Sequence, residues 1–87
     1  MEVEITEMAW KECKQKRLTD REIYVAELVA RGLANRKIAN ELKITPQTVK
    51  RHVQNVSTKL DIRNDDRVRR LVIVERLRRM GLGNNAL

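Results

Sequence analysis

The segment from residue 35 to residue 60 reads NRKIANELKITPQTVKRHVQNVSTKL, and it determines the architecture expected of this chain. Residues 35–42 form a short helical pattern with apolar residues on one face. A second helix is predicted over residues 46–60, because Thr45 can cap its first turn and Pro46 suits the first helical position. A short helix, a turn of about three residues and a capped second helix together form a helix-turn-helix motif.

The second of these helices has two contrasting faces. At helical pitch, one narrow stripe carries only apolar residues and is predicted to be buried: Val49, Val53, Val56 and Leu60. The opposite face is polar and has no acidic residue: Gln47, Lys50, Arg51, Gln54 and Thr58. These side chains can bond bases or phosphates. A plain solvated exterior remains the alternative, although such a face usually includes Asp or Glu.

Two further helices are predicted on either side of this segment. Thr19 and Glu22 can form a capping box for a helix that extends to about residue 31, and Gly32 can adopt the left-handed turn that ends it. A fourth helix is expected to begin near residues 64–66, whose acids suit a helix N-terminus, and to continue to about Met80. We expect no β-strand, because no segment alternates for long between polar and apolar residues.

The N-terminal segment allows two interpretations, an extra helix packed on the domain or a mobile arm. We favour the helix, with Ile5, Met8, Ala9 and Cys13 on one face. The predicted fold is therefore an all-α, four-helix helix-turn-helix domain at 18–81. A short extension at 1–17, either an extra helix or a mobile arm, precedes it, and a frayed tail at 82–87 follows.

Composition narrows the class of function. The chain has 87 residues and a net charge of +7, which favours a polyanionic partner. Cys13 and His52 cannot build a structural zinc site between them, so we expect no metal and no cofactor. No glycine-rich phosphate loop or nucleophile set accompanies His52, so an enzyme is not expected. Without a signal peptide or an apolar span, the protein is expected in the cytoplasm, associated with the nucleoid, and not in a membrane.

Four groups of residues together resemble the LuxR-type (GerE-like) DNA-binding domain of bacterial regulators, over about 18–74. They are Leu18-Thr19-x-Arg21-Glu22, Gly32-Leu33-Ala34-Asn35-Arg36-Lys37-Ile38-Ala39, Leu42-x-Ile44-Thr45-x-x-Thr48-Val49-Lys50-x-His52 and Lys59-Leu60. The resemblance implies four helices that bind double-stranded DNA as a dimer and regulate transcription. Departures include Asp61, where the family usually has Gly, and Asp65, where it usually has Arg.

The resemblance also implies roles for individual residues. The positions that contact bases correspond to Lys50, Arg51 and Gln54, and those that contact the DNA backbone correspond to Asn35, Lys37, Thr48 and Lys59. The chemistry agrees for the first three: Lys50 and Arg51 are long donors suited to guanine or phosphate, and Gln54 can bond adenine in bidentate fashion. We expect His52, which flanks the apolar stripe, to pack rather than to contact bases.

The fourth helix is apolar around most of its circumference, which a helix on the surface of a monomer does not need. We expect Val68, Leu71 and Val72 to face the core. The opposite set is expected to form a two-fold dimer interface, as the family resemblance also implies: Ile73, Leu77 and Met80. The N-terminal segment is the other candidate to cover that face.

The sequence is compatible with two functions. The first is a stand-alone transcriptional regulator that binds specific DNA sequences, since only about 17 residues precede the domain. The second is a protein-interaction module that keeps the helix-turn-helix scaffold and binds RNA polymerase or another regulator. Titration with random-sequence DNA would separate them, because a pure interaction module should not bind.

Overall fold

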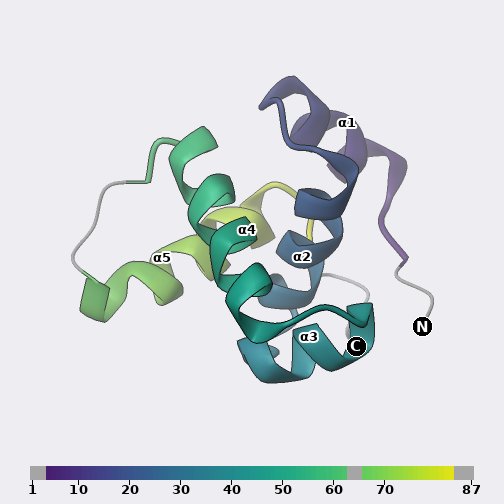
Figure 1. Cartoon of the computed structure of the whole chain (residues 1–87). Helices are drawn as coiled ribbons and strands as arrows, with labels where there is room; N and C mark the ends of the chain where they lie inside the picture. The colour runs from purple at the N-terminus through teal and green to yellow at the C-terminus, as the bar shows by residue number, and fades with distance from the viewer. Residues whose placement is uncertain (1–3, 63–65, 84–87) are drawn as a thin grey trace.

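The computed structural model describes residues 4–62 and 66–83, with side chains at 4–62 and 70–83. In this part of the chain there are five helices and no strand, which confirms the all-α prediction (Figure 1). The helices are α1 (Glu7–Gln15), α2 (Asp20–Ala30), α3 (Asn35–Leu42), α4 (Pro46–Lys59) and α5 (Asp66–Arg79). Each described helix is too short or too polar to cross a membrane.

Local capping fixes the helix boundaries, and the predicted signals are present. The Thr19 hydroxyl accepts from the Glu22 amide at 3.2 Å, and the Glu22 carboxylate accepts from the Thr19 amide at 2.9 Å. Gly32 follows α2 at a φ of +91°, in the left-handed region that favours glycine. At α4, the Thr45 hydroxyl accepts from the Thr48 amide at 3.1 Å, and Pro46 is the first helical residue.

The turn between α3 and α4 is closed by backbone geometry. Lys43 ends α3 in the left-handed conformation, with a φ of 57°. The chain reversal lets the Ile44 amide donate to the Ala39 carbonyl at 3.0 Å, which satisfies a carbonyl at the helix end. The two helices of the motif are therefore joined by a tight turn and pack against each other.

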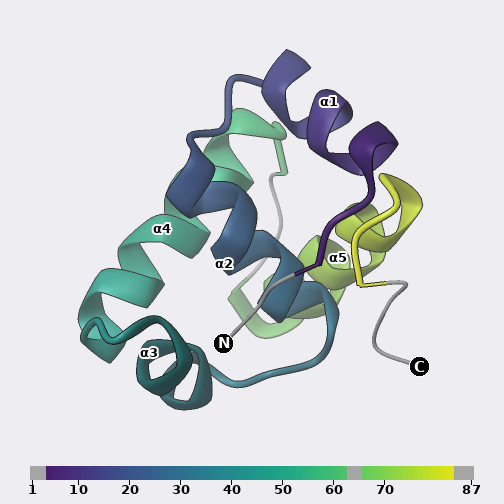
Figure 2. The ribbon, with the colours of Figure 1, turned by 90° about the vertical axis from the view of Figure 1, so that its right-hand side faces the viewer.

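Helix α2 is the centre of the core, and α3, α4 and α5 pack against it (Figures 1 and 2). It is buried around most of its circumference. Its buried residues include the acids Glu22 and Glu27 and six apolar side chains: Ile23, Val25, Ala26, Leu28, Val29 and Ala30. Because α2 occupies the middle, the neighbouring helices each need only one apolar side, and α4 keeps its opposite face exposed.

The predicted orientation of α5 was wrong. Ile73 and Leu77, expected on the outer face, are 2% and 0% exposed, whereas Leu71, expected in the core, is 72% exposed. Ile73 and Leu77 pack between α2 and α4, against side chains that include Val29 and Val56. The pattern could not fix the rotation, because apolar residues occur around the whole helix. Met80 and Val72 are half-buried, and the Val68 side chain lies outside the described residues.

The N-terminal segment forms the extra helix α1, which buries Ala9 and Cys13. Met8 is 83% exposed, so its predicted place on the packed face was wrong. Trp10 lies beside Tyr24 of α2 with ring centroids 5.8 Å apart, and Lys14 Nζ lies 5.4 Å from the Trp10 centroid. A Cβ on Gly81 would lie 3.3 Å from the Ala9 Cβ, so α1 packs closely on the end of α5.

The chain after α5 also packs on the core. Leu82 is fully buried, and the Gly83 amide donates to the Glu27 carboxylate at 2.9 Å. A Cβ on Gly83 would lie 2.8 Å from the Ala30 carbonyl oxygen, too close for any side chain. The frayed tail predicted from residue 82 is therefore wrong for these two residues, and 84–87 lie outside the described residues.

Candidate nucleic-acid interface

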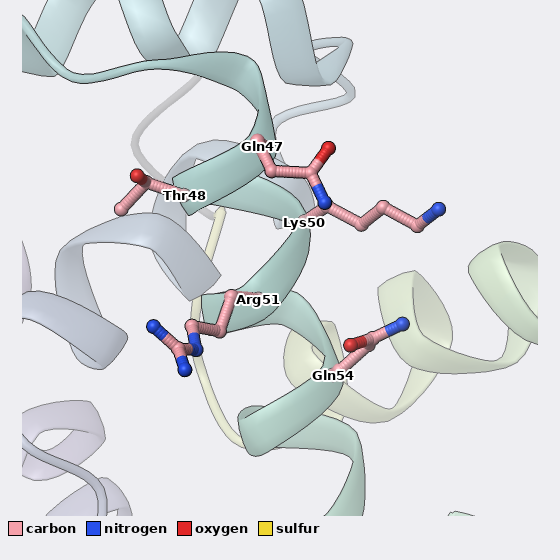
Figure 3. Close-up of a pocket in the computed structure, with 5 residues that line it drawn as sticks. All are labelled: Gln47, Thr48, Lys50, Arg51 and Gln54. Atoms are coloured by element: carbon pink, nitrogen blue, oxygen red, sulfur yellow. The ribbon is translucent and has the colours of Figure 1, made fainter.

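The outer face of α4 is a polar surface without carboxylates. Five side chains line one open hollow there, and Figure 3 shows them along two turns of the helix: Gln47, Thr48, Lys50, Arg51 and Gln54. All are exposed except Thr48, which is half-buried. In Figure 3, Lys50 and Gln54 extend to one side of the helix and Arg51 to the other. The surface therefore presents hydrogen-bond donors on both sides of the exposed face of α4.

The apolar stripe on the other side of α4 sets this orientation. Val49, Val56 and Leu60 are at most 2% exposed, as predicted, and Val53 is half-buried against the same core. The structure thus brings together Lys50, Arg51 and Gln54, the predicted base-contacting residues. It adds Gln47 to the same hollow, a residue that the pattern placed on this face without singling it out.

The hydroxyl groups on α4 are partly engaged within the protein. The Thr48 hydroxyl lies 2.9 Å from that of Thr45, so the two residues fix each other at the start of the helix. The Thr58 hydroxyl donates to the Gln54 carbonyl at 3.0 Å and so bonds its own helix. The polar groups that the hollow on α4 presents to solvent are therefore mainly two carboxamides and two cations.

The start of α3 carries two of the predicted backbone-contacting residues. Lys37 is exposed, with its Nζ 3.7 Å from Glu41 Oε1. Asn35 is half-buried, and its Oδ1 accepts from Arg70 Nη1 at 2.6 Å. Arg70 Nη2 donates to the Leu33 carbonyl at 2.6 Å. Sequence reasoning did not identify Arg70, because nothing local connects it to a residue 35 positions away.

Lys59 joins the end of α4 to the start of α2. Its Nζ donates to Glu22 Oε1 at 2.6 Å and to the Arg17 carbonyl at 2.9 Å. Burial raises the pKa of Glu22, but hydrogen bonds from Lys59 and Thr19 and the charge of Lys59 outweigh it and lower the pKa overall. Since an ammonium group has three donors, Lys59 keeps one for another partner. Its contact with the DNA backbone stays a prediction.

Three other residues that the sequence analysis discussed lie partly or fully inside the molecule: His52, Ile73 and Leu77. His52 is half-buried, and its Nδ1 is buried with no hydrogen-bond partner among the described residues. Ile73 and Leu77 belong to the core of one copy, so they cannot form the predicted dimer interface. The exposed side of α5 instead presents Leu71, beside a shallow hollow lined by Val72, Glu75, Arg76 and Arg79. Within the described residues, no three His, Cys, Asp or Glu side chains gather as metal ligands would.

Comparison with known proteins agrees with this geometry. The nitrate/nitrite response regulator protein NarP of Escherichia coli K12 is 47% identical over 47 residues, which are 54% of this chain and 22% of NarP. The transcriptional regulatory protein LiaR of Bacillus subtilis 168 is 42% identical over 59 residues, which are 68% of this chain and 27% of LiaR. The response regulator protein VraR of Staphylococcus aureus is 43% identical over 47 residues, which are 54% of this chain and 22% of VraR. The chain thus spans about a quarter of the length of these relatives. No solved structure matches it.

A family model described as bacterial regulatory proteins, luxR family, matches residues 16–72. The matched segment includes α2, α3 and α4, and with them the whole helix-turn-helix. The match covers most of the chain, and the chain belongs to the luxR family of bacterial regulatory proteins.

Proposed function

We propose that this protein is a transcriptional regulator that binds specific sequences in double-stranded DNA, with α4 in the major groove. The outer face of α4 carries the argument: it is exposed, polar, free of carboxylates and lined by two cations and two carboxamides. Helices of a helix-turn-helix enter the groove with their N-terminal residues toward the bases, and these side chains lie within the first nine of the 14 residues of α4.

Each side chain has a role in this proposal. Lys50 and Arg51 donate to guanine O6 and N7 or to phosphate, and Gln54 bonds adenine. Gln47, about two turns nearer the start of α4 than Gln54, supplies a second carboxamide in the same hollow. Asn35, Lys37, Thr48 and Lys59 contact the DNA backbone from the edges of this surface. The net charge of +7 strengthens all of these contacts, so affinity should fall steeply with salt.

Selection of bound sites from a random DNA pool tests the proposal. We expect an enriched sequence, and we expect Lys50→Ala and Arg51→Ala each to weaken binding to it by about 1–3 kcal/mol with little change in melting temperature. Lys11→Ala is the matched control, because it removes the same charge from the exposed side of α1. A pool without enrichment would refute sequence-specific binding, and equal affinity for all three variants would refute the roles of Lys50 and Arg51.

We also propose that two copies pair through the outer side of α5. Leu71 is 72% exposed there, and Val72 beside it is half-buried. A two-fold pairing would bury both copies of this apolar surface and place two α4 helices on half-sites about one DNA turn apart. This surface replaces Ile73 and Leu77, which the core already uses.

Sedimentation of Leu71→Glu tests the pairing, since a charge at this position should leave the protein monomeric. Met8→Glu is the control, because Met8 is similarly exposed, at 83%, but lies on α1. If Leu71→Glu sediments as a dimer, the copies pair elsewhere or through α1. If the wild type is monomeric, pairing through α5 is wrong.

A further inference from the structure

Arg70 connects α5 to the start of α3, across the turn that precedes it. Its two terminal nitrogens bind different groups there: Nη1 donates to Asn35 Oδ1 and Nη2 to the Leu33 carbonyl, each at 2.6 Å. Arg70 is half-buried, so these hydrogen bonds are partly shielded from water. The fork therefore holds both the backbone of the turn and the Asn35 side chain.

The chemistry of the fork determines which way the Asn35 carboxamide faces. A guanidinium group only donates hydrogen bonds, so the atom in contact with Nη1 must be the oxygen of the carboxamide. The NH₂ group of Asn35 is then held on the side away from Arg70. Without this partner the carboxamide could rotate by half a turn and present an acceptor instead of a donor.

The surroundings of Asn35 suit an anion. Asn35 is the first residue of α3, no acid occupies the first turn, and the N-cap residue Ala34 offers no side-chain hydrogen bond to the helix amides. The positive end of the helix dipole lies at this point. A phosphate oxygen there would accept from an NH₂ group and would be repelled by a carboxamide oxygen.

We propose that Arg70 is a positioning residue for DNA binding: it holds the Asn35 carboxamide so that its NH₂ group faces the DNA backbone. The assignment rests on the proposed function of the α3–α4 surface. It gives α5 a role in DNA contact, through the orientation of a side chain on another helix.

A double-mutant cycle tests the assignment with a short random-sequence duplex, because a phosphate contact does not depend on base sequence. Dissociation constants are measured by fluorescence anisotropy for the wild type, Arg70→Met, Asn35→Ala and the double variant. Each single variant should bind about threefold to tenfold more weakly, which is the worth of one hydrogen bond. The double variant should bind no more weakly than either, since Arg70 acts through Asn35.

Two further variants separate positioning from charge and from folding. Lys11→Met removes the same charge from an exposed position on α1, where Lys11 pairs with Glu7, and should bind as the wild type does. Asn35→Asp keeps the partner of Arg70 and places an acid at a helix N-terminus, so its melting temperature should not fall. It lacks the NH₂ donor, so it should bind DNA at least as weakly as Asn35→Ala.

The outcomes distinguish this inference from the function on which it rests. Additive losses in the cycle, or wild-type affinity in Asn35→Asp, would overturn the role of Arg70 while DNA binding stands. A melting temperature lowered in Arg70→Met with unchanged affinity would make Arg70 purely structural and overturn it too. A wild-type protein that binds no duplex at all would overturn both proposals.

Discussion

Leu77→Ala should remove a large part of the stability of this domain. Leu77 is fully buried with Ile73 between α2 and α4, in contact with a space lined by Val25, Val29 and Val56. The substitution deletes three carbon atoms, worth about 2.4 kcal/mol at about 0.8 kcal/mol for each buried group. The cavity left behind raises the expected loss to about 3–5 kcal/mol. A domain of 87 residues has about 4–13 kcal/mol in total.

Urea unfolding followed by far-ultraviolet circular dichroism measures this loss in dilute protein. In a separate thermal melt, a loss of about 3 kcal/mol or more should lower the midpoint by at least about 12 °C, because each kcal/mol shifts the midpoint of a domain of this size by about 4–8 °C. Leu71→Ala is the matched control: it deletes the same atoms from the same helix, at a side chain that is 72% exposed. It should cost no more than about 0.5 kcal/mol. A larger loss for Leu71→Ala than for Leu77→Ala would mean that α5 packs through its other side, and the reasoning about the core would be refuted.

Two further predictions concern charge and backbone conformation. The lowered pKa of Glu22 means that its pairing with Lys59 stabilises the fold fully above the ordinary pKa of 4.5 and is lost as pH falls below it. Glu22→Gln, which can still accept from the Thr19 amide, should therefore flatten the acid limb of a stability-against-pH curve, and an unchanged limb would contradict the pairing. Lys43→Gly should raise the free energy of unfolding by about 1 kcal/mol, because Lys43 has a φ of 57°. Chemical denaturation should show no such gain for Lys43→Ala, which keeps the Cβ.

Features set by neighbouring residues were predictable from the sequence. Thr19 with Glu22, and Thr45 with Pro46, mark helix starts through bonds within one turn, so they do not depend on the rest of the fold. The faces of α4 were predictable for a related reason: only one side of that helix is apolar, and only that side can be buried.

Features that depend on distant residues were not predictable. Apolar residues surround α5, so periodicity could not decide that Leu77 packs inward and Leu71 outward. The contact between Arg70 and Asn35 joins two helices and has no local signature. The left-handed φ of 55° at Asp61 gives a physical reason for the glycine usual at that position in the family, but the sequence alone showed only a departure from the pattern.

The packing of α1 and of Leu82 has a practical consequence for anyone who excises this domain. A fragment cut to the family match at 16–72 would lose five of the 18 buried apolar side chains in the described part of the chain: Ala9, Cys13, Ile73, Leu77 and Leu82. We therefore expect a stable fragment to need both flanks, up to Gly83 and its hydrogen bond to Glu27. For grafting this module onto another protein, we therefore expect junctions outside residues 4–83 to be needed, since trimming to the family match would transfer the helix-turn-helix without the side chains that support it.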